Sequence, residues 1–292
     1  MNINSTYVGV FSKSLEVEVT ARQCMNYAAS IGDDNPWHLD DTRDAGIVAP
    51  PMLAVSLTWH ISEQLVDFWG DKAFPYEVLT RQVHYSESIH WERPVYPGDK
   101  LRIEGQVETI VPHRAGSHLI IAYTAYDEQD QVVFVERIGG LLRGVTCEDA
   151  GKGKDDVTDY AGTAGAAPIW TKTVHVSKLA SYIYDACANV PFPIHTSPAF
   201  AKSVGLPGII FQGTGTLAIA VREITAAEAD NDPRRIRAVQ CRFIRMVKPD
   251  TDITVRMLQK ETEGDIIKCH FTVVNAAGKP VLRDGCVEIA SV

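Results

Sequence analysis

The sequence predicts an α+β fold made of two related halves, each with an apolar helix wrapped by an antiparallel sheet. Three observations favour this fold. A Pro-x-His motif occurs twice, at residues 36–38 and 193–195. Each copy is followed by a Gly/Pro-rich turn and an apolar segment with helical spacing, and strand-like alternation ends each half. A similar order with shifted spacing is typical of an old internal duplication.

The first half contains each of these elements in turn. Gly46, Pro50 and Pro51 mark a turn that interrupts regular structure. Apolar residues then recur at the three- and four-residue spacing of a helix, and period-two alternation follows. The expected elements are a turn at 45–51, a helix over 53–68, a strand over 83–91 and a hairpin of 119–126 with 132–135.

The second half repeats this order. Its turn contains three glycines and one proline, and the apolar segment after it again has helical spacing. The residues between its last two strands, which include Asn275 and Gly278, suit a hairpin. The expected elements are a turn at 205–213, a helix over 217–224, a strand over 239–243 and a hairpin of 266–274 with 281–289.

The middle of the chain has the composition of a linker. Residues 148–168 are rich in Gly, Ala, Asp, Lys and Thr and carry almost no large apolar side chain. Such a composition favours a connection over a packed element. We therefore expect an N-terminal repeat over 1–147, a linker over 148–168 and a C-terminal repeat over 169–292.

Composition excludes several classes of function. The 292 residues are 45% apolar and 22% charged, as in a soluble globular protein. The net charge of −9 argues against general nucleic-acid binding, which needs a basic face. No 18-residue apolar run exists, so we expect no membrane span. The first residues lack the basic and apolar regions of a secretory signal, and a cytoplasmic location is expected.

The six cysteines are scattered and contain no C-x-x-C pair. Most have apolar neighbours, which favours buried thiols in a reducing compartment over disulfides or zinc ligands. The histidines outside the two Pro-x-His motifs show no metal-ligand spacing with cysteines or carboxylates. The sequence therefore predicts no metal site.

The first Pro-x-His motif lies in a longer pattern, Gly-Asp-x-Asn-Pro-x-His, with Asp33, Asn35 and His38 as its polar members. This pattern resembles that of the hydratase 2 (MaoC-like) acyl-thioester hydratases and dehydratases, which have a double hot-dog fold. Residues 46–51 resemble the N-terminal half of the fatty-acid dehydratase subfamily. Residues 195–214 resemble the C-terminal half of double hot-dog members, and the resemblance covers nearly the whole chain outside the linker.

The resemblance implies a reaction and a substrate. The expected reaction is reversible addition of water across a 2-enoyl thioester, usually giving the (R)-3-hydroxyacyl product. The substrate would be an acyl-CoA or an acyl-carrier thioester that enters between the halves, and no metal or organic cofactor would take part. Self-association into a homodimer is left open.

Asp33 and His38 suit this chemistry. Water addition needs a base for the water and an acid for C2, together with hydrogen-bond donors for the thioester oxygen. Five positions apart, the two side chains would diverge on a regular helix. The residue before a proline avoids the α region, so Asn35 and Pro36 predict a loop that brings both groups to one water molecule. The Asn35 amide could hold the loop or the water.

The two halves divide the remaining features of such a site between them. Gln212, Gly213 and Thr214 open the second helix, where free backbone N–H groups could bind the thioester oxygen. The matching residues of the first half are prolines, which have no N–H. Conversely, the second half has Val190 where the first has Asp33. The half with the acid–histidine pair thus lacks the donors, and the half with the donors lacks the acid.

Three interpretations follow. The site is composite, with Asp33 and His38 acting on a thioester held by other donors, or it is the C-terminal one and uses His195, or the chemistry is altered. We prefer Asp33 and His38 as the catalytic pair, with His195 as the alternative and Asn35, Gln212, Gly213 and Thr214 as substrate-binding residues. A repurposed or non-catalytic protein that binds an acyl or polyketide-like ligand, and a thioesterase, remain alternative functions.

Overall fold

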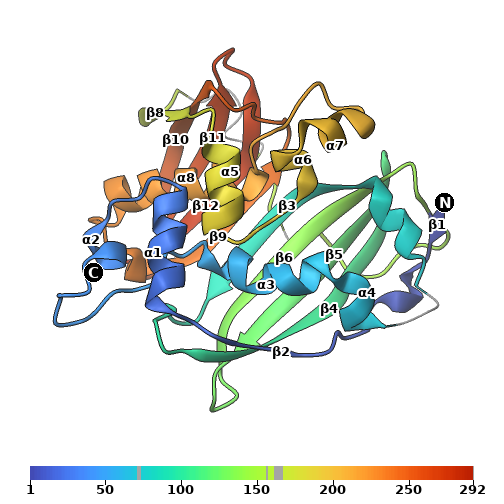
Figure 1. Cartoon of the computed structure of the whole chain (residues 1–292), viewed down its shortest axis with the longest axis horizontal. Helices are drawn as coiled ribbons and strands as arrows, with labels where there is room; N and C mark the ends of the chain where they lie inside the picture. Colours follow the sequence, from blue (N-terminus) through green and yellow to red (C-terminus); the bar gives the residue numbers. More distant parts are fainter. Residues whose placement is uncertain (71–73, 156, 161–166, 292) are drawn as a thin grey trace.

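The computed structural model describes residues 1–70, 74–155, 157–160 and 167–291 (Figure 1). The first half contains β1 (Asn2–Ile3), η1 (Ser5–Tyr7), β2 (Leu15–Glu18), α1 (Ala21–Ser30), α2 (Pro36–Leu39), α3 (Leu53–Glu63), α4 (Leu65–Trp69), η2 (Tyr76–Arg81), β3 (Gln82–Trp91), β4 (Lys100–His113), β5 (Gly116–Tyr126), β6 (Val132–Arg143) and β7 (Thr146–Cys147). The second contains β8 (Trp170–Val176), α5 (Ala180–Cys187), α6 (Pro193–Thr196), α7 (Pro198–Ser203), α8 (Gly213–Glu228), η4 (Pro233–Arg235), β9 (Ile236–Phe243), β10 (Thr251–Glu263), β11 (Ile266–Asn275) and β12 (Pro280–Ala290).

One antiparallel sheet of ten strands runs through both halves, in the order β2-β4-β5-β6-β3-β9-β12-β11-β10-β8. The strands β3 and β9 join the halves, with Ser86 opposite Arg242 and His90 opposite Ala238. Each side of this junction therefore holds one helix-covered half-sheet, as Figure 1 shows for α3 over β3–β6. The predicted α+β class is confirmed, and the halves share one continuous sheet.

The central helix of each half is buried for the reason its spacing predicts. In α8, Leu217, Val221 and Ile224 are almost inaccessible to solvent and belong to the common core. In α3 the same holds for Leu57 and Ile61. Burial of each such side chain stabilises the fold by roughly 1.5–3 kcal/mol, so these helices anchor the two half-sheets.

The structure corrects the expected continuous helix over 53–68. The helix α3 ends at Glu63 and α4 begins at Leu65, because the backbone leaves the helical region at Gln64 (φ −114°, ψ 40°). The break lets Phe68 pack edge-on against His60, with their ring centroids 5.8 Å apart. These ring contacts come from tertiary packing, which the apolar spacing does not report. The helix over 217–224 is longer than expected, spanning Gly213–Glu228.

The helices α1 and α5 were not expected from the sequence. Each precedes one of the Pro-x-His loops, and the two lie against each other where the halves meet. Their buried tyrosines Tyr27 and Tyr184 form a hydrogen bond of 3.0 Å between hydroxyl oxygens, with the rings edge to face. The contact holds the two loops in a fixed relation to each other.

The expected linker, 148–168, includes residues 156 and 161–166, which lie outside the described residues. Its first part is attached to both halves. Asp149 accepts hydrogen bonds from the Ser5 backbone N–H (3.0 Å) and hydroxyl (2.8 Å). The buried Arg242 forms an ion pair with Asp155 (2.9 Å) and donates to the Val157 carbonyl (2.7 Å). The boundaries 1–147 and 169–292 stay a prediction. No helix in the described part of the chain is long and apolar enough to cross a membrane.

One buried histidine makes stability depend on pH. Burial, the largest influence, lowers the pKa of His118 in β5 to about 4. A histidine in the unfolded chain has a pKa of about 6.5, so between pH values of about 4 and 6.5 the unfolded chain binds more protons than the folded chain. Stability from the neutral His118 is full above about pH 6.5 and is lost as the pH falls toward 4. We expect the unfolding free energy of the wild type, relative to His118→Gln, to fall by on the order of 1–2 kcal/mol between pH values of about 7.5 and 5.

Urea denaturation of both proteins at the two pH values measures this difference, and the comparison cancels the titration of groups that do not interact with His118. The exposed His90 provides a control. Its His90→Gln variant should follow the wild type at both pH values. If the unfolding free energies of the wild type and His118→Gln changed by the same amount between the two pH values, the lowered pKa of His118 would be contradicted.

Candidate active site

The two Pro-x-His loops hold their histidines in the same way. The Nδ1 atom of His38 donates a hydrogen bond of 2.8 Å to the Val48 carbonyl, and that of His195 donates one of 2.8 Å to the Ile210 carbonyl. A carbonyl can only accept, so Nδ1 carries the proton of each neutral ring. The Nε2 atom of each histidine is therefore free to accept a proton or a hydrogen bond.

The first loop brings Asp33 and His38 together. The Asp33 Oδ2 atom lies 3.6 Å from His38 Nε2, and the two side chains are 11% and 1% exposed. Oδ1 of Asp33 accepts the Asn35 backbone N–H at 3.1 Å, which closes a turn around the loop. Burial lowers the pKa of His38, and the Asp33 charge partly opposes this shift. The pair can orient one proton between them.

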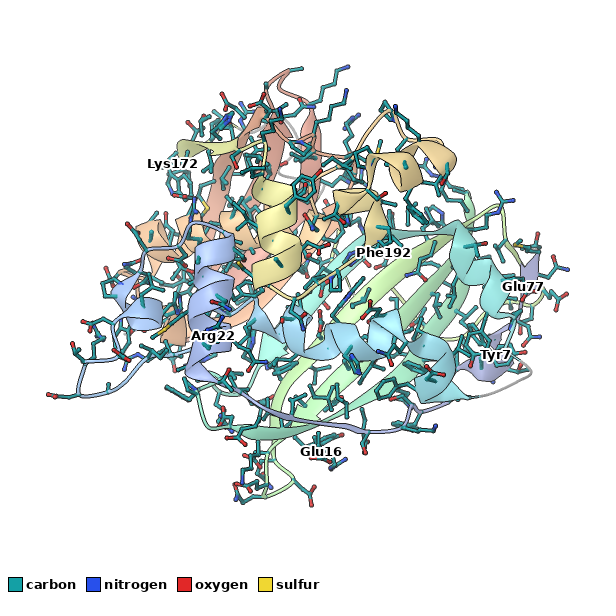
Figure 2. The ribbon with its side chains drawn as sticks, in the orientation of Figure 1. Tyr7, Glu16, Arg22, Glu77, Lys172 and Phe192 are labelled. Atoms are coloured by element: carbon teal, nitrogen blue, oxygen red, sulfur yellow. The ribbon has the colours of Figure 1, made fainter. Side chains whose placement is uncertain are left out.

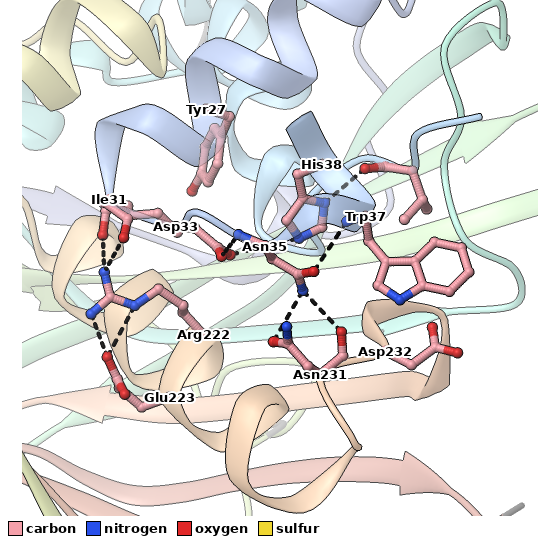
Figure 3. A network of polar contacts seen from close by, with 12 residues as sticks. Tyr27, Ile31, Asp33, Asn35, Trp37, His38, Arg222, Glu223, Asn231 and Asp232 are labelled. Atoms are coloured by element: carbon pink, nitrogen blue, oxygen red, sulfur yellow. Dashed lines mark hydrogen bonds and ion pairs between the residues drawn. The ribbon is translucent and has the colours of Figure 1, made fainter. Parts of the chain in front are cut away.

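The Asn35 amide holds this loop to the second half (Figure 3). Its Nδ2 donates to the Asn231 backbone carbonyl at 2.9 Å and side-chain oxygen at 3.2 Å. Arg222 of α8 donates to the carbonyls of Ile31 and Gly32, the latter at 3.0 Å. Trp37 lies under the guanidinium of Arg234, 3.8 Å from its ring centroid. These contacts seal the loop against the C-terminal end of α8.

The space left beside Asp33 and His38 is small. It has a volume of about 10 Å³ and is lined on the first-half side by Pro50, Pro51 and Met52. That is about the room one water molecule needs. A thioester would enter only if Arg222 and the Asn231 turn moved away.

Removal of the Asn35 amide should weaken the junction of the halves. Asn35 is 4% exposed, and Asn35→Ala would leave the Asn231 carbonyl and the Trp37 N–H, both in partly buried hydrogen bonds, without their side-chain partner. We expect a loss of about 1–3 kcal/mol in unfolding free energy by urea denaturation. Gln129→Ala, on the exposed β5–β6 turn, is the control and should change it by less than about 0.5 kcal/mol. Equal stabilities of the two variants would show that the contact contributes nothing.

His195 lies at a different and much larger cavity. The volume is about 2560 Å³, well above the roughly 300–1,000 Å³ of most ligand pockets. Residues of both halves line it, including Trp59 of α3 and Thr214 of α8. Trp59 donates from its indole N–H to the Pro191 carbonyl at 3.2 Å and packs edge-on against Phe192. Phe192, labelled in Figure 2, thus lies where the second loop meets the first half.

The first turn of α8 borders the same cavity. Gln212, Gly213 and Thr214 all line it, and α8 begins at Gly213. The first N–H groups of a helix have no intrahelical acceptor. Tyr184 donates to the Thr214 hydroxyl at 3.1 Å, so the tyrosine contact between α1 and α5 also positions this turn. The donors and His195 therefore face one space.

Close packing against Phe243 also favours glycine at position 213. A Cβ atom added there would meet the Phe243 ring at 3.0 Å. The corresponding turn of the first half begins α3 after Pro50 and Pro51, and these residues offer no N–H to a ligand. The two helix starts thus differ in whether they can bind an oxyanion.

Burial is the largest influence on His195 and lowers its pKa to about 4, so its ring is neutral at pH 7. Val190, which occupies the place of Asp33 in the second loop, is 4% exposed and belongs to the apolar core. The structure thus groups the candidate residues into two sets. Asp33, Asn35 and His38 form one, and His195 with Gln212–Thr214 forms the other.

Sequence reasoning missed a polar cluster on the cavity wall of the first half. His84 lines the large cavity, and its Nε2 lies 2.9 Å from the Glu87 Oε2 atom. Behind it, the Thr58 hydroxyl of α3 donates to Glu136 of β6. A signal was present, because Glu87 shares the strand face of the buried Ile89 and would be an unusual residue there. In the described part of the chain, no group of three or more His, Cys, Asp or Glu side chains could hold a metal ion.

Comparison with known proteins identifies both halves. Residues 6–137 match the FAS1-like dehydratase domain region, and residues 160–278 match the MaoC-like domain. The chain joins a FAS1-like dehydratase region to a MaoC-like domain. The predicted resemblance to the MaoC-like and FAS1-like dehydratases is therefore confirmed.

Relatives of this MaoC-like chain support the same family. It is 25% identical over 296 residues to the peroxisomal multifunctional enzyme type 2 of Drosophila melanogaster. The aligned region covers 94% of this chain and 46% of that protein. The chain thus spans about half the length of that relative. A MaoC-like dehydratase from Phytophthora capsici superimposes with a TM-score of 0.85 at 21% identity, covering 99% of this chain and 100% of the other.

A Mycobacterium tuberculosis protein described as having a double hotdog fold superimposes with a TM-score of 0.63 at 13% identity, covering 97% of this chain and 96% of the other. At these identities the structural similarities establish the fold. The predicted double hot-dog fold is confirmed.

Proposed function

We propose that this chain adds water reversibly to a 2-enoyl thioester, and removes it from the 3-hydroxyacyl thioester, in the cavity that the two halves share. One observation carries the proposal: His195 and the N-terminal turn of α8 face the same cavity, which is large enough for an acyl thioester. The MaoC-like and FAS1-like dehydratase matches support the hydratase and dehydratase class.

Each group has a task in this reaction. The thioester oxygen gains negative charge as the enolate forms, and N–H groups of the Gly213–Thr214 turn can donate to it. The partial positive charge of the helix N-terminus adds to this stabilisation. The Nε2 atom of His195 accepts a hydrogen bond from the water that attacks C3, or from the hydroxyl that leaves it. No step requires a metal.

The lining of the cavity fits the two ends of such a substrate. Apolar side chains of the first half, among them Leu119, Ile121 and Ile138, would surround the acyl chain. Charged residues also line it, with five cations (Arg81, Arg143, Lys178, Arg245, Lys248) against three acids (Glu63, Asp67, Asp250). This local excess of two positive charges, in a chain of net charge −9, favours an anionic handle such as CoA or a carrier phosphopantetheine.

The test is turnover of purified protein with crotonyl-CoA and longer 2-enoyl-CoAs, followed by loss of the enoyl absorbance and by detection of the 3-hydroxyacyl product. Water addition supports the proposal. A thermal shift with these ligands and no turnover would instead favour an acyl-binding protein. Release of free CoA without the hydroxyacyl product would identify a thioesterase.

The pair Asp33 and His38 is the second candidate site for the same reaction. Its support is the contact of 3.6 Å between carboxylate and imidazole, a combination suited to holding one water. In this case the Arg222 and Asn231 contacts would have to open to admit the thioester. Variants at His38 and His195 separate the two candidates.

A further inference from the structure

The cavity contains a second imidazole that the proposed function does not use. His84 of β3 lies on the first-half wall, where its ring packs against Phe243 with centroids 4.4 Å apart. Phe243 also contacts the position where α8 begins, because a Cβ on Gly213 would meet its ring. His195 lines the same cavity. Both rings therefore border the space beside the α8 turn.

The orientation of the His84 ring leaves one nitrogen for chemistry. Its Nε2 atom lies 2.9 Å from the Glu87 Oε2 atom and 3.0 Å from the Ser86 carbonyl oxygen. Both are acceptors when Glu87 is ionised, so Nε2 carries the ring proton and Nδ1 has the free lone pair. A carboxylate that holds a neutral imidazole in one tautomer also stabilises the imidazolium formed when the ring takes a proton.

The carboxylate behind His84 is part of a buried pair. Glu87 and Glu136 are both fully buried and interact electrostatically, and Thr58 donates to Glu136. Burial and the neighbouring Glu87 charge raise the pKa of Glu136 well above its ordinary value. The raised pKa favours the protonated form of Glu136, which can donate to Glu87 and leave one negative charge on the pair beside His84. A buried charge is costly, and an apolar pair would pack this core without that cost.

We propose that His84 is a catalytic residue of the hydration reaction and that Glu87 and Glu136 position it and stabilise its charged form. This inference rests on the proposed function and names a residue that moves the proton. It also explains how the second loop can lack an acid at Val190. The carboxylate and imidazole are supplied from the opposite half of the molecule.

The step balances with neutral rings at the start. In the dehydration direction, His84 Nδ1 takes the proton from C2, and the C–H electron pair moves into the thioester enolate held by the α8 turn. The C3–O bond then breaks as C2=C3 forms. The departing oxygen, held by His195 Nε2, takes the proton back from His84 and leaves as water. Hydration is the reverse, and no other reactant is needed.

The test compares His84→Ala, Glu87→Gln and the wild type, as full chains, with crotonyl-CoA. We expect both variants to lose about 10²- to 10⁴-fold in kcat with KM changed only a few-fold, because the proton transfer occurs after binding. Added imidazole should restore part of the His84→Ala activity and none of the Glu87→Gln activity. His90→Gln, on the exposed face of the same strand, is the matched control and should retain wild-type kcat.

The outcomes separate this inference from the proposed function. Wild-type hydration with a kcat in His84→Ala within a few-fold of wild type would overturn the role of His84 and leave the function intact. A large loss of kcat in His84→Ala that added imidazole does not restore, together with a large fall in its melting temperature relative to the wild type, would also overturn it. His84 would then be structural. A wild type that adds no water to any 2-enoyl-CoA would overturn the function itself.

Discussion

The His195→Ala variant is expected to lose about 10²- to 10⁴-fold in turnover of crotonyl-CoA, while His38→Ala stays within a few-fold of the wild type. The physical reason is access. His195 borders a cavity of about 2560 Å³ that also contains the α8 turn, whereas His38 borders a space of about 10 Å³ sealed by Arg222 and Asn231. Steady-state kinetics of both variants, with melting temperatures to confirm folding, measure the difference.

The opposite result has a definite meaning. If His38→Ala and Asp33→Asn both lose activity while His195→Ala retains it, the pair Asp33 and His38 performs the reaction. The first loop must then open from the Asn231 turn during turnover. That outcome would support the preference drawn from the sequence motif and would exclude the large cavity as the place of chemistry.

The Gly213→Pro variant is expected to lose about 10²- to 10³-fold in kcat, because it removes one N–H group from the turn that would bind the thioester oxygen. Proline is compatible with the backbone there. Gly213 is the first residue of α8, and the preceding Gln212 is extended (φ −58°, ψ 135°), as a residue before proline prefers. The substitution makes the second turn resemble the first, where Pro51 stands at the matching position.

Gly213→Ala is the matched control. It introduces the same Cβ contact with the Phe243 ring, at 3.0 Å, and keeps the N–H. We expect its kcat to lie well above that of Gly213→Pro, with both proteins folded by circular dichroism. Equal losses in the two variants would mean that the Phe243 contact, and not the donor, controls activity.

Much of the fold could be predicted from local patterns. The helices around Leu57 and Leu217 follow from apolar spacing, and the strands follow from alternation, because both periodicities are properties of the backbone itself. The break at Gln64 and the helices α1 and α5 could not be predicted. At Gln64 the backbone leaves the helical region although the apolar spacing continues to Phe68. The helices α1 and α5 pack through the contact of Tyr27 with Tyr184, which lie 157 residues apart in the sequence.

The candidate site, like the fold, could be predicted only in part from the sequence. Two short motifs predict Asp33, His38 and His195 as site residues, and the position of Gly213 predicts the α8 turn. The motif could not report that Asn35 would bind Asn231, 196 residues away, and so close the first loop. Nor could it report that Glu87 and Glu136 would meet from two different strands behind His84.

The sequence by itself determined the double hot-dog fold, the family of each half, and the two loops that carry an imidazole. Only the tertiary structure decided which imidazole faces a cavity large enough for a thioester and which is sealed between the halves. The physical reason is that spacing along the chain sets backbone geometry, and so the periodicity from which helices and strands are predicted. Access and charge depend instead on side chains such as Arg222 and Glu136, which the fold brings from other elements.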